Sequence, residues 1–284
     1  MAKLTHQYWR RFLWAGFTSF FAVVTFVVSS PAPALGKKKK AAAPPPAELP
    51  DRVAALGRQL LSLPLDESDA VTGQIQELVI ADLRAWFDKQ PASVAPSDAP
   101  FDVRVRRVME NAFSRLHYPV FGQPQVFTQS WNGGVLTGAG YTLGWSDYDR
   151  VNVVALFDTR DGKTQLAGLA HFVLYTDLHY AFLPAPNTGS FRFLAYGFRL
   201  GKSQPRLSAV LYEYDGKALK SLWETRDVYD GKMEVENNTV TIRYLKEDEY
   251  IRELTYNRKP PRHLAVYKSS PKGLTLESDR EIPF

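Results

Sequence analysis

The chain has 284 residues, 45% hydrophobic and 23% charged, and no cysteine; this fits one large globular domain or two small ones and excludes disulfide bonds, thiol catalysis and cysteine-bound zinc. The net charge of +5 comes from residues 1–40, which hold seven basic groups and no acidic one, whereas the other 244 residues carry 28 basic and 30 acidic groups. The body of the chain is therefore not expected to bind nucleic acid, because attraction to phosphate requires a basic face on the folded domain.

Residues 1–36 have the parts of a secretory signal peptide. A basic start precedes an uncharged apolar run, residues 12–28, and small residues follow at positions that suit cleavage after Ala34 or Gly36. The alternative is a retained membrane anchor, because the run is just long enough to span a bilayer and the basic group Lys37–Lys40 weakens the charge asymmetry that drives export. Both interpretations predict an exported protein, periplasmic or extracellular. In the second interpretation the protein stays anchored in the membrane.

Residues 37–50, KKKKAAAPPPAELP, are predicted to form a disordered tether. Their lysines, alanines and prolines offer no apolar face to bury and favour extended or polyproline geometry. The four lysines are interpreted as a solvated charge run, and the alternative is contact with anionic lipid or a wall polymer. Any membrane contact is therefore expected through residues 12–28 and Lys37 to Lys40.

Residues 51–118 are predicted to form a helical segment. Apolar residues recur at steps of three and four from Leu49 to Leu63, from Val71 to Trp86 and from Phe101 to Leu116, and prolines close the first two stretches. Four arginines lie off the apolar stripe of the third stretch: Arg104, Arg106, Arg107 and Arg115. They are interpreted as the solvated face of this helix, and the alternative is a binding patch.

Residues 119–284 are predicted to form an antiparallel β domain. Short runs rich in Val, Tyr, Phe, Thr and Trp alternate with Gly, Asp, Asn and Pro, and the short connections favour antiparallel neighbours. The predicted strands are Gln125–Trp131, Gly134–Leu143, Val151–Asp158, Gln165–Tyr175, Ser190–Leu200, Arg206–Tyr214, Leu219–Asp227, Lys232–Glu236, Thr239–Leu245, Tyr250–Tyr256, His263–Lys268 and Leu274–Glu277.

The predicted fold class is α+β: a short N-terminal helical segment followed by a mainly antiparallel β meander. The sheet is expected to be rolled or folded into a sandwich. Consecutive strands between residues 190 and 245 also have the rhythm of a β-propeller blade, which makes a propeller-blade-like arrangement the second interpretation.

Three Asp-Gly-Lys triplets raise the question of whether they form a ligand site. Each Asp-Gly pair lies between two predicted strands, and such a pair is a strong signal for a tight hairpin turn because glycine tolerates a positive φ. The pairs are Asp161-Gly162, Asp215-Gly216 and Asp230-Gly231, and Asn237-Asn238 is predicted to turn the chain in the same way. We interpret the triplets as turns whose lysines point into solvent, and not as a site.

Motifs for nucleotide and metal sites are incomplete. The stretch GGVLTGAGYTLGW, residues 133–145, has one residue too many for a dinucleotide-binding loop and is interpreted as a glycine-bearing strand with close packing. The potential metal ligands His171, Asp177 and His179 would span about 26 Å in an extended strand, so no metal site is assigned. No cofactor and no catalytic residue are assigned either.

Aromatic residues make up 13% of the chain, and three of them flank the loop between the first strands. Trp131, Trp145 and Tyr148 are candidates to stack on a sugar or to insert into a protein partner, and the alternative is that they fill the β core. The sequence predicts a non-enzymatic binding or structural protein of the cell envelope. Its expected partner is an envelope protein or a glycan.

The alternative function is an envelope hydrolase that acts on a glycan or an ester. Such an enzyme needs two carboxylates that face each other in a cleft. The sequence offers these candidates without marking any of them: Asp147, Asp149, Asp177, Glu213 and Glu224. Their placement in the folded chain discriminates between the two functions.

Overall fold

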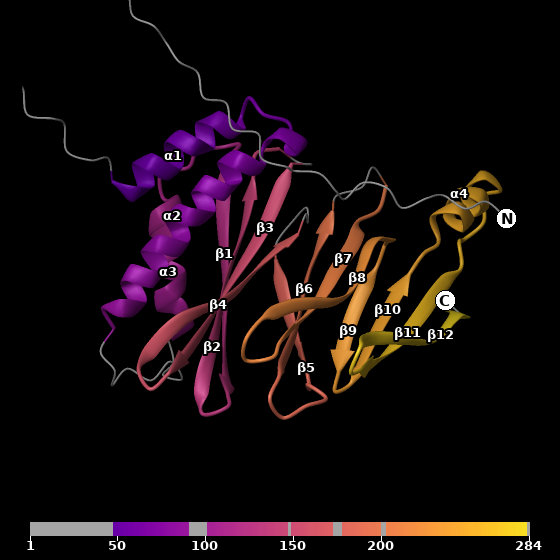
Figure 1. Cartoon of the computed structure of the whole chain (residues 1–284). Helices are drawn as coiled ribbons and strands as arrows, with labels where there is room; N and C mark the ends of the chain where they lie inside the picture. Colours follow the sequence, from indigo (N-terminus) through magenta and orange to yellow (C-terminus); the bar gives the residue numbers. More distant parts are fainter. Residues whose placement is uncertain (1–47, 91–100, 147–148, 173–177, 200–202, 283–284) are drawn as a thin grey trace, which may run out of the picture. The chain divides into compact units, whose positions relative to one another are not determined.

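A computed structural model describes residues 48–90, 101–146, 149–172, 178–199 and 203–282 (Figure 1). The fold class is α+β, as predicted: a few helices and three mainly antiparallel sheets of four strands each, which do not close into a barrel. The described helices and strands belong to one compact unit, Pro46–Phe284. The predicted signal peptide or anchor and residues 37–47 of the predicted tether lie outside the described residues.

Three helices form the helical segment, as the spacing of apolar residues predicts. α1 spans Leu49–Leu60, α2 spans Asp69–Asp88 and α3 spans Phe101–Phe113, and a short 3-10 turn, Leu65–Glu67, separates the first two. Pro50 lies in the first turn of α1, where its missing N–H has no helical partner to lose. The last residues of the predicted tether therefore belong to a helix.

The strands form three sheets, each an antiparallel meander in chain order. The first sheet contains β1 (Phe121–Trp131), β2 (Gly134–Gly144), β3 (Arg150–Arg160) and β4 (Lys163–Phe172). The second contains β5 (His179–Leu183), β6 (Phe191–Arg199), β7 (Arg206–Tyr214) and β8 (Leu219–Tyr229). The third contains β9 (Lys232–Glu236), β10 (Thr239–Tyr244), β11 (Arg262–Ser270) and β12 (Gly273–Ile282).

Two details of the predicted strands are wrong, and the strands of the second interpretation are divided between two sheets. Residues 250–256 belong to helix α4, Glu247–Thr255, whose first turn holds three acidic residues that complement the helix dipole. β5 is absent from the predicted strands because its sequence, HYAFL, is short and shows no alternation of apolar and polar residues. The strands between residues 190 and 245 do not make one blade, since β6 to β8 belong to the second sheet and β9 and β10 to the third.

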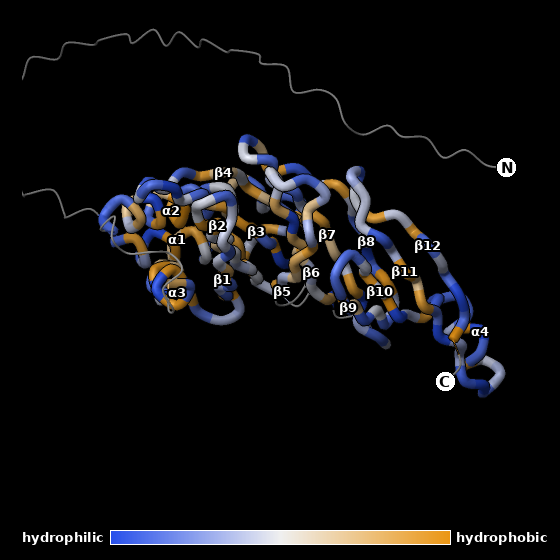
Figure 2. The backbone as a smooth tube through the Cα atoms, turned by 90° about the horizontal axis from the view of Figure 1, so that it is seen from below, coloured by the Kyte–Doolittle hydropathy of each residue, from blue (hydrophilic) through white to orange (hydrophobic). Residues whose placement is uncertain are grey.

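Three hydrophobic cores join the helices and the sheets in order. The first core contains residues of α1, α2, α3 and the first sheet; the second lies between the first and second sheets, and the third between the second and third sheets. Figure 2 shows the hydrophobic residues of the helices and strands that supply these cores. α3 contacts β1 and β2, and α2 contacts β3 and β4, so the first sheet is covered on one face by helices and on the other by the second sheet.

The Asp-Gly pairs form turns, with one correction. Gly162 between β3 and β4 has a φ of 71°, and Gly216 between β7 and β8 has a φ of 86°, as expected for hairpin turns. Asp230-Gly231 instead connects the second sheet to the third, and Asp230 rather than the glycine has the positive φ, 47°. Gly231 is needed for space, because a Cβ there would lie 2.8 Å from the Cβ of Leu207. The lysines that follow the three pairs are exposed.

The glycines of β2 make room for aromatic rings. The stretch forms a strand with close packing, as predicted. A Cβ at Gly138 would collide with the ring of Phe127 on β1, and a Cβ at Gly140 would collide with the hydroxyl of Tyr180 on β5. Because β5 belongs to the second sheet, the missing side chain at Gly140 allows the two sheets to approach each other.

Candidate functional site

Two of the three predicted ligand-binding aromatics lie in the hydrophobic cores. Trp131 and Trp145 are only 8% and 5% exposed. The ring of Trp131 lies 5.1 Å from that of Tyr214, and the indole N–H of Trp145 donates a hydrogen bond to the Leu63 carbonyl at 3.3 Å. These contacts agree with the alternative that the tryptophans fill the core. Tyr148 lies outside the described residues.

The potential metal ligands are spread over the fold. His171 lies on β4 of the first sheet and His179 on β5 of the second, while Asp177 falls outside the described residues. Within the described ranges, no group of three or more histidines and carboxylates could hold a metal ion. His263 is buried, and its Nε2 lies 2.7 Å from Oε2 of Glu249, which connects α4 to β11.

The carboxylates of the hydrolase hypothesis that the structure describes each have a separate partner. Asp149 accepts a hydrogen bond from the Ser146 hydroxyl at 2.8 Å, Glu213 pairs with Arg192 at 2.6 Å, and Glu224 pairs with Arg226 at 3.0 Å. Asp147 and Asp177 lie outside the described residues. The hydrogen bonds of the described carboxylates therefore serve local structure.

A cleft lies between the C-terminal half of α2 and α3, and we call it the α2–α3 cleft. It has a volume of about 490 Å³. α2 lines it with Asp82, Ala85, Trp86, Lys89 and the following residue Gln90. α3 lines it with Arg104, Arg107, Val108 and Asn111. Residues three or four apart share a face of a helix, so the spacing on each helix places these side chains on the cleft.

Packed aromatic rings hold the two helices together beside the cleft. The ring of Phe101 on α3 lies 5.7 Å from that of Trp86 and 6.1 Å from that of Phe87, both on α2. Phe87 also contacts Phe157 on β3, with 4.8 Å between ring centroids. Phe87, Phe101 and Phe157 are buried, so the walls of the cleft rest on the hydrophobic core.

The α2–α3 cleft carries an excess of positive charge. Among the described residues that line it, Lys89, Arg104 and Arg107 face a single carboxylate, Asp82. Among the described residues, neither arginine has a carboxylate within ion-pair distance; the guanidinium of Arg104 lies over the ring of Phe101 at 5.4 Å, and its Nε is buried without a hydrogen-bond partner. Burial raises the pKa of Asp82, and the charge of Lys89 partly opposes this rise. The cleft is thus suited to a ligand with negative charge.

The four arginines predicted as the solvated face of the third helix have different surroundings. Arg104 and Arg107 line the cleft, whereas Arg106 does not. Arg115 forms ion pairs with Glu48 and with Asp51 of α1. The sequence gives the spacing of Arg104 and Arg107 on α3, but it does not show that α2 places a tryptophan and a lysine opposite them.

Comparison with known proteins adds no functional assignment. The sequence matches no protein-family model, and no curated protein sequence matches it at a significant level. Among the helices that the structure describes, none is both long enough and apolar enough to span a membrane.

Proposed function

We propose that the protein is a non-enzymatic binding protein of the cell envelope, exported by its N-terminal segment, and that its ligand is an acidic glycan bound in the α2–α3 cleft. One observation carries the proposal: Arg104 and Arg107 line a cleft of about 490 Å³ and lack a carboxylate partner among the described residues. A volume of this size lies within the range of about 300–1,000 Å³ that is usual for ligand pockets.

The chemistry of the lining supports a sugar that carries negative charge. A guanidinium group binds a carboxylate or a phosphate through two parallel hydrogen bonds, and Arg104 and Arg107 supply two such groups one helical turn apart. Trp86 offers an aromatic surface against which a sugar ring can pack. The carboxamides of Gln90 and Asn111 can donate to and accept from sugar hydroxyls.

The binding of tetragalacturonate, with neutral maltotetraose for comparison, tests the ligand class by isothermal titration calorimetry on the native protein. We expect the acidic sugar to bind and the neutral one to bind at least tenfold more weakly. The variant R104Q/R107Q removes two charge-assisted contacts and is expected to weaken binding of tetragalacturonate by at least about tenfold. The matched control is R58Q/R106Q, which removes the same charge from α1 and α3 outside the cleft.

Equal losses in the two double variants would show that only the net charge matters and would overturn the cleft as the site. The basic group Lys37–Lys40 is a competing anion-binding segment, so a third variant replaces these four lysines with glutamine. We expect this variant to change the affinity less than threefold. A larger effect there than in R104Q/R107Q would assign the binding to the tether.

The envelope location is tested separately by the intact mass of the native protein after subcellular fractionation. The expected result is an envelope or secreted chain cut after Ala34 or Gly36. A full-length chain in the membrane fraction would show that the N-terminal segment is retained as an anchor and not cleaved, with the protein still in the envelope. A full-length chain in the cytosol would contradict the proposed location.

A further inference from the structure

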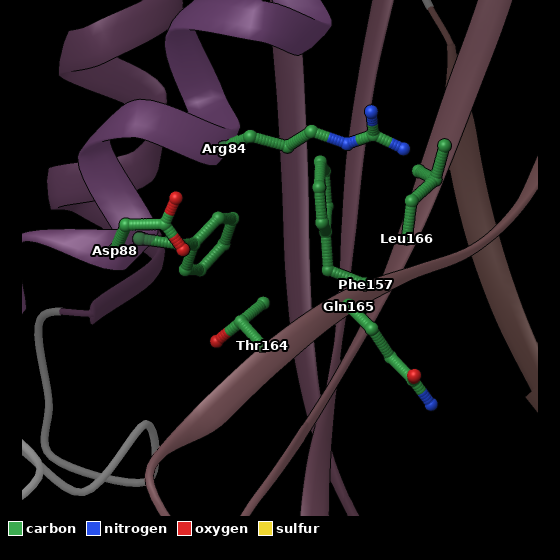
Figure 3. Close-up of a pocket in the computed structure, with 7 residues that line it drawn as sticks. Arg84, Asp88, Phe157, Thr164, Gln165 and Leu166 are labelled. Carbon is green, nitrogen blue, oxygen red and sulfur yellow. The ribbon is translucent and has the colours of Figure 1, made fainter.

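A second pocket, on the side of α2 that faces the first sheet, combines one cation, one anion and an apolar floor. We call it the α2–β4 pocket; Figure 3 shows it, and its volume is about 330 Å³. Arg84 and Asp88 come from α2, Phe157 from β3, and Thr164, Gln165 and Leu166 from β4. The described residues of its lining have a formal charge of zero, in contrast to those of the positive α2–α3 cleft on the other side of the same helix.

The two charged side chains of this pocket do not neutralise each other. Arg84 and Asp88 are four residues apart on α2, a spacing at which an ion pair commonly forms. Neither takes part in an ion pair or hydrogen bond with any residue that the structure describes. Figure 3 shows Arg84 extending across Phe157 toward Leu166, whereas Asp88 stays on the helix side of the pocket. The pocket therefore presents separate positive and negative ends.

Between these ends a ligand can reach the half-buried Leu166, whereas Phe157 lies beneath the surface of the pocket. Phe157 is fully buried, and its ring lies 4.8 Å from that of Phe87. Leu166 packs against the same core. Thr164 shares a hydrogen bond of 2.8 Å with Thr159, which fixes the hydroxyl on the β4 side of the rim. A ligand that pairs with both charged ends can place an apolar group against Leu166.

We infer that the α2–β4 pocket binds a small zwitterion with an apolar side chain, of the amino-acid class. Its carboxylate pairs with the guanidinium of Arg84, its ammonium group pairs with the carboxylate of Asp88, and its side chain packs on Leu166. The residues that carry this inference are different from those of the α2–α3 cleft, so it stands or falls independently of the acidic-glycan proposal.

Three probes that differ by one charged group test the inference on the native protein by ligand-observed NMR titration. Leucine carries both charges, leucinamide lacks the carboxylate, and 4-methylpentanoate lacks the ammonium group. We expect leucine to bind at least fivefold more tightly than either analogue. R84Q removes the partner of the ligand carboxylate and is therefore expected to abolish the preference for leucine over leucinamide. D88N removes the partner of the ligand ammonium group and is expected to abolish the preference for leucine over 4-methylpentanoate.

R107Q is the control, since it removes one positive charge from the neighbouring α2–α3 cleft and is expected to leave both preferences unchanged. Arg84 and Asp88 are exposed, so their variants are expected to keep the wild-type melting temperature. Equal binding of the three probes would show a merely apolar pocket and overturn the inference. Absence of leucine binding, or preferences that survive R84Q and D88N, would overturn it as well.

Discussion

Replacing Arg192 with methionine is expected to lower the free energy of unfolding by about 3–5 kcal/mol, the usual cost of leaving a buried ion pair without one partner. Arg192 on β6 is fully buried. Its guanidinium donates to Glu213 Oε2 at 2.6 Å, to Ser269 Oγ at 3.0 Å, to the Ser270 carbonyl at 2.7 Å and to the Pro271 carbonyl at 3.1 Å. The last three partners belong to the end of β11 and the turn after it, so one side chain joins the second sheet to the third.

Urea denaturation of R192M and of the control R226M measures this effect. Arg226 pairs with Glu224 at 3.0 Å, but both side chains are more than half exposed, and its replacement is expected to cost less than about 1 kcal/mol. Proteolysis of R192M under native conditions is expected to cut first in the third sheet. If R192M is as stable as R226M, the buried arginine does not hold the sheets together.

Replacing Gly138 with alanine is expected to destabilise the fold by about 1–3 kcal/mol, the range for overpacking a filled core. The added Cβ collides with the ring of Phe127. That ring cannot move aside freely, because Tyr180 and Phe193 pack against it with centroids at 4.7 Å and 5.3 Å. The change therefore strains the core between the first and second sheets.

Gly73 on α2 is the matched control, since nothing lies within 4 Å of a Cβ built there. Alanine at this helical position is expected to stabilise the protein by about 0.5–1 kcal/mol. The melting temperatures of G138A and G73A should therefore shift in opposite directions from that of the native protein. The additional replacement Phe127→Leu is expected to recover part of the stability that G138A loses. If the melting temperatures of the two glycine variants shift in the same direction, Gly138 is not required for the packing of Phe127.

Local patterns in the sequence predicted most of the secondary structure. The three helices of the helical segment follow from apolar steps of three and four, and the hairpins at Gly162 and Gly216 follow from the backbone freedom of glycine. α4 was missed because its nine residues carry exposed apolar side chains, such as Ile251 and Leu254, that suggest a strand.

The grouping of strands into sheets could not be read from local patterns. The pair Asp230-Gly231 has the sequence of a hairpin turn, yet β8 and β9 belong to different sheets. Long-range contacts separate them: among the described strands β9 pairs only with β10, and contacts such as those of Arg192 determine how the third sheet packs on the second. Such contacts join residues that are far apart in the chain, and a pattern within a short stretch of sequence cannot reveal them.

The candidate sites were also beyond the reach of local patterns. The sequence predicts that Arg104 and Arg107 lie off the apolar stripe of their helix, and this is confirmed because neither is among the buried residues of α3. A solvated helix face and one wall of a cleft have the same pattern, however. The distinction depends on α2, which supplies Trp86 and Lys89 from a separate stretch of sequence.

Backbone amide chemical shifts, followed during a titration of the native protein with tetragalacturonate, map the position of the bound acidic sugar and test whether it lies in the α2–α3 cleft. If the sugar binds in the α2–α3 cleft, the largest shifts fall in residues 82–90, which cover the end of α2 and the two residues after it, and in residues 104–111 of α3. These shifts are expected to disappear in R104Q/R107Q. Largest shifts at Lys37–Lys40 or in the third sheet, with the amides of the α2–α3 cleft unchanged, would contradict binding in this cleft.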